Sequence, residues 1–219
     1  RIMEDVIFSY SDRFPVKTAR FANVAFSNGS LPAGFLARLQ KLQPISAPSD
    51  VKRYFVSPEE SGQICMLACM LGRNREIFFP RLEKEQMMTF DKIATAFLKE
   101  NGFEVLECDS DEKAIELAED LKNGGLIYPV HYSKSNTSGE KAYEEFYTDQ
   151  ECVDLNRLKA LGIVTGKEMP DKERIEVLFA KLNKAFENET SKEEIVAIMK
   201  DYLPNFEHIE TGKSLDSKM

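Results

Sequence analysis

Hydrophobic and polar positions alternate along this chain in patterns that predict alternating strands and helices. Short runs rich in β-branched and aromatic residues predict strands, and apolar residues spaced three or four positions apart predict helices. The strands are expected at 17–26, 53–56, 76–80, 103–108 and 126–132, and the helices at 1–10, 32–41, 58–71, 90–101 and 111–122. This alternation predicts an α/β fold.

Local signals mark several of these elements. Pro58 and the two glutamates after it predict the start of a buried helix, because proline suits a first helical turn and acidic side chains suit the positive end of the helix dipole. Gly102 ends the helix at 90–101. Three prolines within 44–58 predict a short hairpin that ends in Arg53–Val56.

Beyond residue 133 the pattern becomes polar and then helical. A polar loop leads into a short charged helix expected at 140–147. A long amphipathic helix is expected from Asp171, and a second begins after Ser191, where Glu194 completes a capping box. The polar ending at 211–219 is expected to fray.

The composition narrows the classes of function. The chain has 219 residues, of which 42% are hydrophobic, so it is long enough for a sizeable core. It carries 29 Lys and Arg against 37 Asp and Glu, a net charge of -8, which argues against a general nucleic-acid binder. An anionic ligand would therefore need a local basic pocket.

No apolar run is long enough to span a bilayer, since the most apolar stretch is only Ile64–Leu71. The first five residues lack the features of a secretory signal, so a cytoplasmic protein is expected. No C-x-x-C pair indicates metal or redox chemistry, and the cysteines are expected to be buried free thiols. They are Cys65, Cys69, Cys108 and Cys152.

No catalytic residue and no metal ligand can be assigned. His131 and His208 have no partner at a known ligand or triad spacing, and His131 is interpreted as a core or edge residue of a strand. Glu144 and Glu145 are interpreted as a solvated helix face, because adjacent helical residues point in different directions. The sequence has neither G-x-G-x-x-G after a strand nor the full G-x-x-x-x-G-K-[ST] phosphate loop.

Three places are candidates for ligand binding. Asn23 and Ser30 follow a predicted strand into a loop, at the end of a strand where open α/β sheets bind ligands, although an ordinary turn would look the same. Arg53 could bind a diphosphate with two parallel hydrogen bonds, or it could be a solvated surface charge. Glu140 and Lys141 offer a carboxylate and an ammonium, suited to a ribose diol and an anionic oxygen.

Four segments, taken together and in order, resemble a known family. They are Arg20-Phe-Ala-Asn-Val-Ala-Phe-Ser-Asn-Gly-Ser-Leu31, Pro44-Ile with Arg53-Tyr-Phe-Val-Ser-Pro-Glu-Glu60, Glu76-Ile-Phe-Phe-Pro80, and Gly139-Glu-Lys with Glu144-Glu-Phe146. The chain resembles the polysaccharide-biosynthesis branch of the extended short-chain dehydrogenases, and within it the UDP-N-acetylglucosamine 4,6-dehydratases, including those of nonulosonic (legionaminic-type) acid pathways. The resemblance covers roughly residues 1 to 165.

The resemblance implies the carboxyl-terminal part of a Rossmann-like fold, with a substrate-binding subdomain and trailing helices. Residues 1–43 would be a remnant of the Rossmann-like domain, 44–165 the substrate-binding portion, and 166–219 the final helices and tail. The catalytic Tyr-x-x-x-Lys pair and most of the NAD or NADP site would lie upstream of Arg1. This chain alone would then be inactive, and the family implies a homodimer.

The resemblance also implies a role for each candidate residue in binding a UDP-sugar. Asn23 would contact the diphosphate or the sugar, Ser30 the sugar, Arg53 the diphosphate, and Glu140 the ribose, with Lys141 beside it. Many relatives have Arg-Pro before Gly-Glu-Lys, whereas this chain has Thr137 and Ser138. A phosphate contact made by that arginine in relatives would be missing here.

The implied reaction of the parent enzyme is an internal redox cycle. NAD(P)+ takes hydride from C4 of the sugar, water leaves across C5 and C6, and the hydride returns to C6. An epimerase of the same class, a binding module without catalysis and an acidic structural module without ligand are the alternatives. The last of these predicts that Asn23, Arg53 and Glu140 lie on unrelated surfaces.

Overall fold

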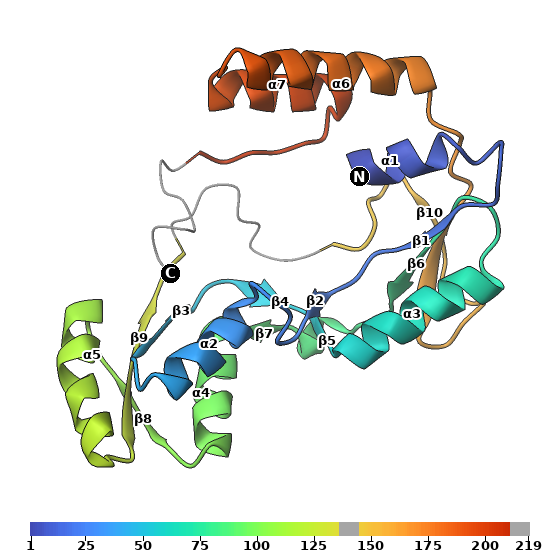
Figure 1. Cartoon of the computed structure of the whole chain (residues 1–219). Helices are drawn as coiled ribbons and strands as arrows, with labels where there is room; N and C mark the ends of the chain where they lie inside the picture. Colours follow the sequence, from blue (N-terminus) through green and yellow to red (C-terminus); the bar gives the residue numbers. More distant parts are fainter. Residues whose placement is uncertain (136–144, 211–219) are drawn as a thin grey trace.

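The computed structural model describes residues 1–135 and 145–210, and it confirms the predicted α/β fold class (Figure 1). Two sheets of more than two strands form separate lobes, and two short strand pairs lie between them. Among the described residues, no helix is both long and apolar enough to cross a membrane.

The larger sheet has the strand order β1-β6-β11-β10. Strand β1 (Lys17–Ala19) runs parallel to β6 (Glu76–Pro80), and β11 (Leu161–Thr165) runs antiparallel to both β6 and β10 (Cys152–Asp154). Helix α3 (Pro58–Leu71) packs against β1 and β6. The fully buried side chains here are Phe8, Ile77, Phe78, Phe79, Ile163 and Val164.

The smaller sheet is entirely parallel, in the order β3-β9-β8. Its strands are β3 (Ile45–Pro48), β8 (Glu104–Glu107) and β9 (Ile127–Ser133). Its helices are α2 (Leu31–Gln40), α4 (Phe90–Glu100) and α5 (Asp111–Leu117), which continues as the 3-10 helix η2 (Ala118–Asn123). The core between them is formed by Phe35, Ile45, Ala94, Leu98, Tyr128 and Val130.

Two short strand pairs connect the lobes. Strand β2 (Asn23–Val24) runs parallel to β5 (Phe55–Val56), and β4 (Lys52–Arg53) runs antiparallel to β7 (Met88–Thr89), which follows the 3-10 helix η1 (Lys84–Gln86). The hairpin expected within 44–58 is therefore wrong. Each strand of that segment finds its partner in a distant part of the chain.

Other expected elements also differ. The single strand expected at 17–26 is two strands in different sheets, because the chain leaves β6 after Arg20 and pairs next with β5. Strands β10 and β11 were not expected. Residues 145–147 are not helical, and the rest of the helix expected at 140–147 lies outside the described residues.

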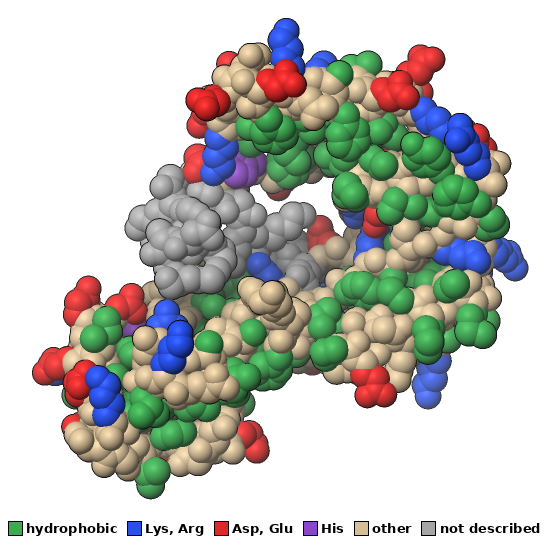
Figure 2. Space-filling model, in the orientation of Figure 1, with side chains coloured by type: hydrophobic (Ala, Val, Ile, Leu, Met, Phe, Trp, Pro, Cys, Tyr) green, Lys and Arg blue, Asp and Glu red, His purple; other side chains and the backbone are tan. Residues whose placement is uncertain are grey.

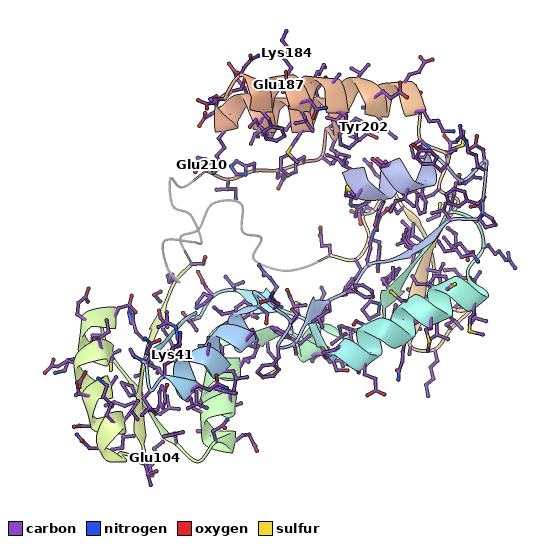
Figure 3. All side chains as sticks on the ribbon, viewed as in Figure 1. Lys41, Glu104, Lys184, Glu187, Tyr202 and Glu210 are labelled. Carbon is purple, nitrogen blue, oxygen red and sulfur yellow. The ribbon has the colours of Figure 1, made fainter. Side chains whose placement is uncertain are left out.

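Helices α6 (Lys172–Glu187) and α7 (Lys192–Tyr202) confirm the two expected after Asp171 and Ser191. They lie side by side, and α6 contacts α1 (Ile2–Phe8). Figure 3 shows Tyr202 at the end of α7 near α1, and its hydroxyl donates to a carboxylate oxygen of Asp5 at 3.3 Å. Apolar side chains gather on the side of the α6–α7 pair that faces α1 (Figure 2).

Helix α3 is less buried than expected. Only Ile64 and Ala68 are buried within it. Cys65 and Cys69 lie about 100° around the helix from these positions, so both are exposed, as is Cys152 on β10; Cys108 is buried. The expectation that the cysteines are buried is wrong for all but Cys108.

Candidate functional site

A pocket of about 400 Å³ lies where β2, the start of α2, and the ends of β3 and β9 meet. This volume is within the usual range for small-molecule sites. Strands β3 and β9 are parallel, so both present their carboxyl ends to the pocket. That edge of a parallel sheet is where open α/β folds bind ligands.

Asn23 is held at the wall of the pocket by the β2–β5 pair. Its backbone N–H donates to the carbonyl oxygen of Tyr54 at 3.0 Å, and its side-chain amide donates to the same oxygen at 3.4 Å. The next ladder bond, from Ala25 N–H to the carbonyl oxygen of Val56, is 2.9 Å. The amide of Asn23 therefore lines the pocket from a fixed backbone.

The loop from β2 to α2 turns tightly around the pocket. Ser27 N–H donates to the carbonyl oxygen of Val24 at 3.2 Å, and Gly29 has φ 76°, a left-handed conformation that glycine adopts without steric cost. Phe26 also has a positive φ, 57°, which is strained for a bulky residue and costs about 1–3 kcal/mol. Strain of this kind is commonest at functional sites.

Ser30 ends this loop and caps α2. Its hydroxyl oxygen accepts a hydrogen bond from Ala33 N–H at 3.3 Å. A hydroxyl has one hydrogen to donate in addition to the lone pair used in the cap. Ser30 can therefore stabilise the helix and donate to a ligand in the pocket at the same time.

Among the described residues that line the pocket, Arg53 is the one with a charged side chain. It lies on β4, opposite Met88 of β7, and its Nη1 donates to the carbonyl oxygen of Lys52 at 2.9 Å. Next to it, the rings of Phe55 and Phe90 meet edge to face with centroids 5.8 Å apart. The cation thus lies beside an aromatic wall.

Serine side chains line the side of the pocket formed by β3 and β9. Ser46 lies on β3, and Ser133 and Ser135 lie at and after the end of β9. The backbone there is fixed, since Ser49 N–H donates to the carbonyl oxygen of Ser133 at 3.0 Å and Ser135 N–H donates to Asp50 Oδ1 at 2.8 Å. Hydroxyls, amides and one guanidinium suit a ligand that carries both hydroxyl groups and negative charge.

Next to the pocket-forming strands, Arg20 makes a network of ion pairs at the end of β1. Its guanidinium donates to Glu4 at 2.8 Å from Nε, to Glu151 at 2.7 Å from Nη2, and to the carbonyl oxygen of Phe146 at 2.7 Å from Nη1. The ring of Phe146 stacks on that of Phe79 at a centroid distance of 5.9 Å. These contacts of Arg20 link the segment that contains Phe146 and Glu151 to α1 and to the larger sheet.

The charges in this network set the protonation of its members. Burial alone would raise the pKa of Glu151, but hydrogen bonds from Arg20, the Thr148 amide and Arg1 outweigh burial and lower it to about 2. Burial would also raise the pKa of Glu4, but the hydrogen bond from Arg20 outweighs burial and lowers it. Burial would lower the pKa of Arg20, but both glutamates raise it. The network is ionised at neutral pH.

A family model described as polysaccharide biosynthesis protein matches residues 1–165. This range is three quarters of the chain and includes every residue that lines the pocket. The chain belongs to the polysaccharide biosynthesis protein family. Family membership supports a role in sugar biosynthesis, which agrees with the resemblance described above. No curated protein matches the chain.

A solved structure described as Pen from Bacillus thuringiensis shares the fold of this member of the polysaccharide biosynthesis family. The TM-score is 0.53 at 19% sequence identity, and the match covers 77% of this chain and 47% of that chain. At this identity the likeness shows the fold alone. The chain spans less than half the length of that structure.

Three of the five expected binding residues of this family member, Asn23, Ser30 and Arg53, line one pocket. Asn23 and Arg53 line the same pocket, whereas the structural-module alternative predicted that they lie on unrelated surfaces. Glu140 and Lys141 lie outside the described residues. The binding roles of all five stay predictions.

The sequence reasoning missed the serines on the side of β3 and β9. Ser133 ends a predicted strand, so the rule that ligands bind at strand ends could have found it. Ser46 had no such signal. His131 lies on β9, which is the central strand of its sheet, so the edge position considered for it is wrong. Its Nδ1 lies 2.8 Å from Asp111 Oδ1. Within residues 1–135 and 145–210, no three His, Cys, Asp or Glu side chains are placed to hold a metal ion.

Proposed function

We propose that this chain is the substrate-binding portion of a nucleotide-sugar 4,6-dehydratase of surface polysaccharide or nonulosonic acid biosynthesis, and that its pocket binds a UDP-N-acetylglucosamine-type sugar. The observation that carries the proposal is the position of Arg53 in the pocket beside Asn23 and Ser30. A single cation among hydroxyls and amides suits a diphosphate attached to a sugar.

In this proposal each part of the pocket has a separate task. Arg53 binds the diphosphate through charge-assisted hydrogen bonds, the Phe55–Phe90 wall excludes water and packs against a ring, and the amide and hydroxyls orient the sugar. An epimerase of the same class would use the same pocket. With a cofactor-binding half present, loss of water from the product would identify a dehydratase, and an isomer of unchanged mass an epimerase.

NAD or NADP is the cofactor proposed for the parent reaction, in which it would accept and return the hydride. The residues described here do not fit it. The turn from β2 to α2 contains one glycine, Gly29, whereas a dinucleotide-binding turn needs several so that the backbone can approach the pyrophosphate. No step of hydride transfer is therefore assigned to residues of this chain.

Calorimetric titration with UDP, UDP-N-acetylglucosamine and uridine tests the proposal. The Arg53→Ala variant should weaken UDP binding about 10- to 100-fold, since a hydrogen bond to a charged group contributes about 1.5–3 kcal/mol. Uridine, which has no phosphate, should bind both proteins alike. Lys41→Ala is the matched control, because Lys41 is at the far end of α2 from the pocket (Figure 3).

Absence of UDP binding by the folded chain would contradict the proposal. So would equal losses of UDP affinity in the Arg53→Ala and Lys41→Ala variants, because a general effect of net charge would then explain the result.

A further inference from the structure

The outer face of α3 carries an unusual group of sulfur atoms. Cys65, Met66, Cys69 and Met70 lie within six consecutive residues, and all four are exposed, Met66 at 61% and Met70 at 79%. The whole chain has 4 cysteines and 8 methionines, so one third of its sulfur-bearing residues lie here. Core packing does not explain them, because α3 buries only Ile64 and Ala68.

Helix geometry brings these side chains together in pairs. Cys65 and Cys69 are four residues apart, as are Met66 and Met70, and Met66 is three residues from Cys69. Residues at these spacings are neighbours on a helix surface, with Cβ atoms about 5–6 Å apart. Gly62, one turn before Met66, contributes no side chain and leaves open space on the same face.

The helix is a well-formed support for this group. Ser57 and Glu60 form a complete capping box at its start, with bonds of 2.6 Å and 3.0 Å. Near its end, the Lys17 ammonium donates to the carbonyl oxygen of Cys69 at 2.9 Å. Two thiolates with one monovalent cation would carry a net negative charge, which the ammonium of Lys17 would partly balance.

We propose that this face of α3 is a binding site for a soft monovalent cation, Cu(I), with the thiolates of Cys65 and Cys69 as principal ligands and the thioethers of Met66 and Met70 completing the site. Thiolate and thioether ligands select Cu(I). Zn(II) prefers four nitrogen, oxygen or thiolate ligands, which the described residues do not gather here. Binding releases the protons of the two thiols.

Anaerobic titration with Cu(I) in competition with a chromogenic chelator tests the site. We expect one Cu(I) per chain. Cys65→Ser and Cys69→Ser should each weaken binding more than about 100-fold, since changes outside the ligand set alone cost 10- to 100-fold. The double variant Met66→Leu/Met70→Leu keeps the apolar bulk and removes only the sulfurs, and it should weaken binding about tenfold.

Cys152→Ser is the matched control, because Cys152 is an exposed thiol on another element. It should bind Cu(I) as the unchanged protein does. The proposal would be overturned if Cys65→Ser bound Cu(I) as tightly as the unchanged protein, if Cys152→Ser lost Cu(I) binding, or if equimolar Zn(II) displaced Cu(I). Unchanged binding by the double methionine variant would overturn the four-sulfur site. Far-UV circular dichroism of the same variants reports whether they are folded and is expected to match that of the unchanged protein.

Discussion

Gly162 lies opposite Phe79 in the register of β11 and β6, and its missing side chain makes room for the phenylalanine ring. A Cβ at residue 162 would overlap that ring. The ring cannot move aside easily, because Phe79 is only 2% exposed and contacts the rings of Phe146 and Tyr147. The close approach of the two strands therefore depends on glycine at this position.

We predict that Gly162→Ala lowers the free energy of unfolding by about 1–3 kcal/mol, the usual cost of overfilling a packed core. Gly62→Ala is the same substitution on the open face of α3 and should raise stability by about 0.5–1 kcal/mol, because alanine favours the helix. Urea unfolding of both variants measures the two effects. A loss of stability in both, or in neither, would contradict the role assigned to Gly162.

At the scale of residues, the sequence predicted part of the pocket. Asn23 and Ser30 follow a recognisable strand into a turn, and Arg53 is a cation within a motif of the family that the chain resembles, so local pattern and resemblance found them. Ser46 lies in a short strand between prolines, where nothing in the sequence indicates that it will meet the end of β9. Its place depends on strand pairing over more than 80 residues, which local pattern does not encode.

At the scale of elements, the Arg20 network joins α1, β1 and the segment before β10. Because the pKa of Glu151 is lowered to about 2 in the folded chain, its stabilisation is full above the pKa of an unfolded glutamate, about 4.3, and is lost as the pH falls toward 2. The shift corresponds to roughly 3 kcal/mol.

We predict that Glu151→Gln removes this pH dependence. Between pH 6 and pH 3, the unchanged protein should lose more stability than the variant, so that the two unfolding midpoints converge as the pH falls. Urea unfolding at a series of pH values measures the difference. Asp149→Asn is a control, since Asp149 is a nearby acidic side chain for which no contact with Arg20 is found. Parallel curves for Glu151→Gln and the unchanged protein would contradict the prediction.

Long elements with a clear period were predicted well, and short ones were not. Helices α3, α6 and α7 have side-chain N-caps, α4 has a clear apolar stripe, and the sequence placed all four. The strands near 44–58 have two to four residues each, so turn signals dominated and predicted a hairpin. Tertiary pairing overrode that local preference.

At the scale of the whole molecule, the α6–α7 pair is a separate layer that is held by few contacts. Helix α6 buries Ile175, Leu178 and Ala185, whereas α7 has no buried residue. Surface ion pairs such as Lys172 with Asp12, at 3.2 Å, add little stability. This layer should therefore open without unfolding of the sheets.

We predict that backbone amides of α7 exchange with deuterium faster than those of β6. Leu178→Ala, which removes a buried side chain at a cost of about 2–5 kcal/mol, should increase exchange in α6 and α7 more than tenfold and leave β6 unchanged. Val177→Ala, at an exposed neighbouring position, is the control. Equal acceleration in β6 would show instead that the layer and the sheet unfold together.

The homodimer, the cytoplasmic location and the domain boundaries at residues 43 and 165 stay predictions.

In the larger sheet, strands that pair with each other are synthesised at different times on the ribosome. Strand β6 is buried at all five positions, yet one of its two partners, β11, begins only at Leu161. Translation proceeds at about 5–20 residues per second, so roughly 4 to 16 seconds pass between the synthesis of β6 and that of β11. Over this interval an apolar Ile-Phe-Phe edge is open to other nascent chains. We therefore expect newly made protein to depend on a chaperone that shields this segment until β11 has been translated.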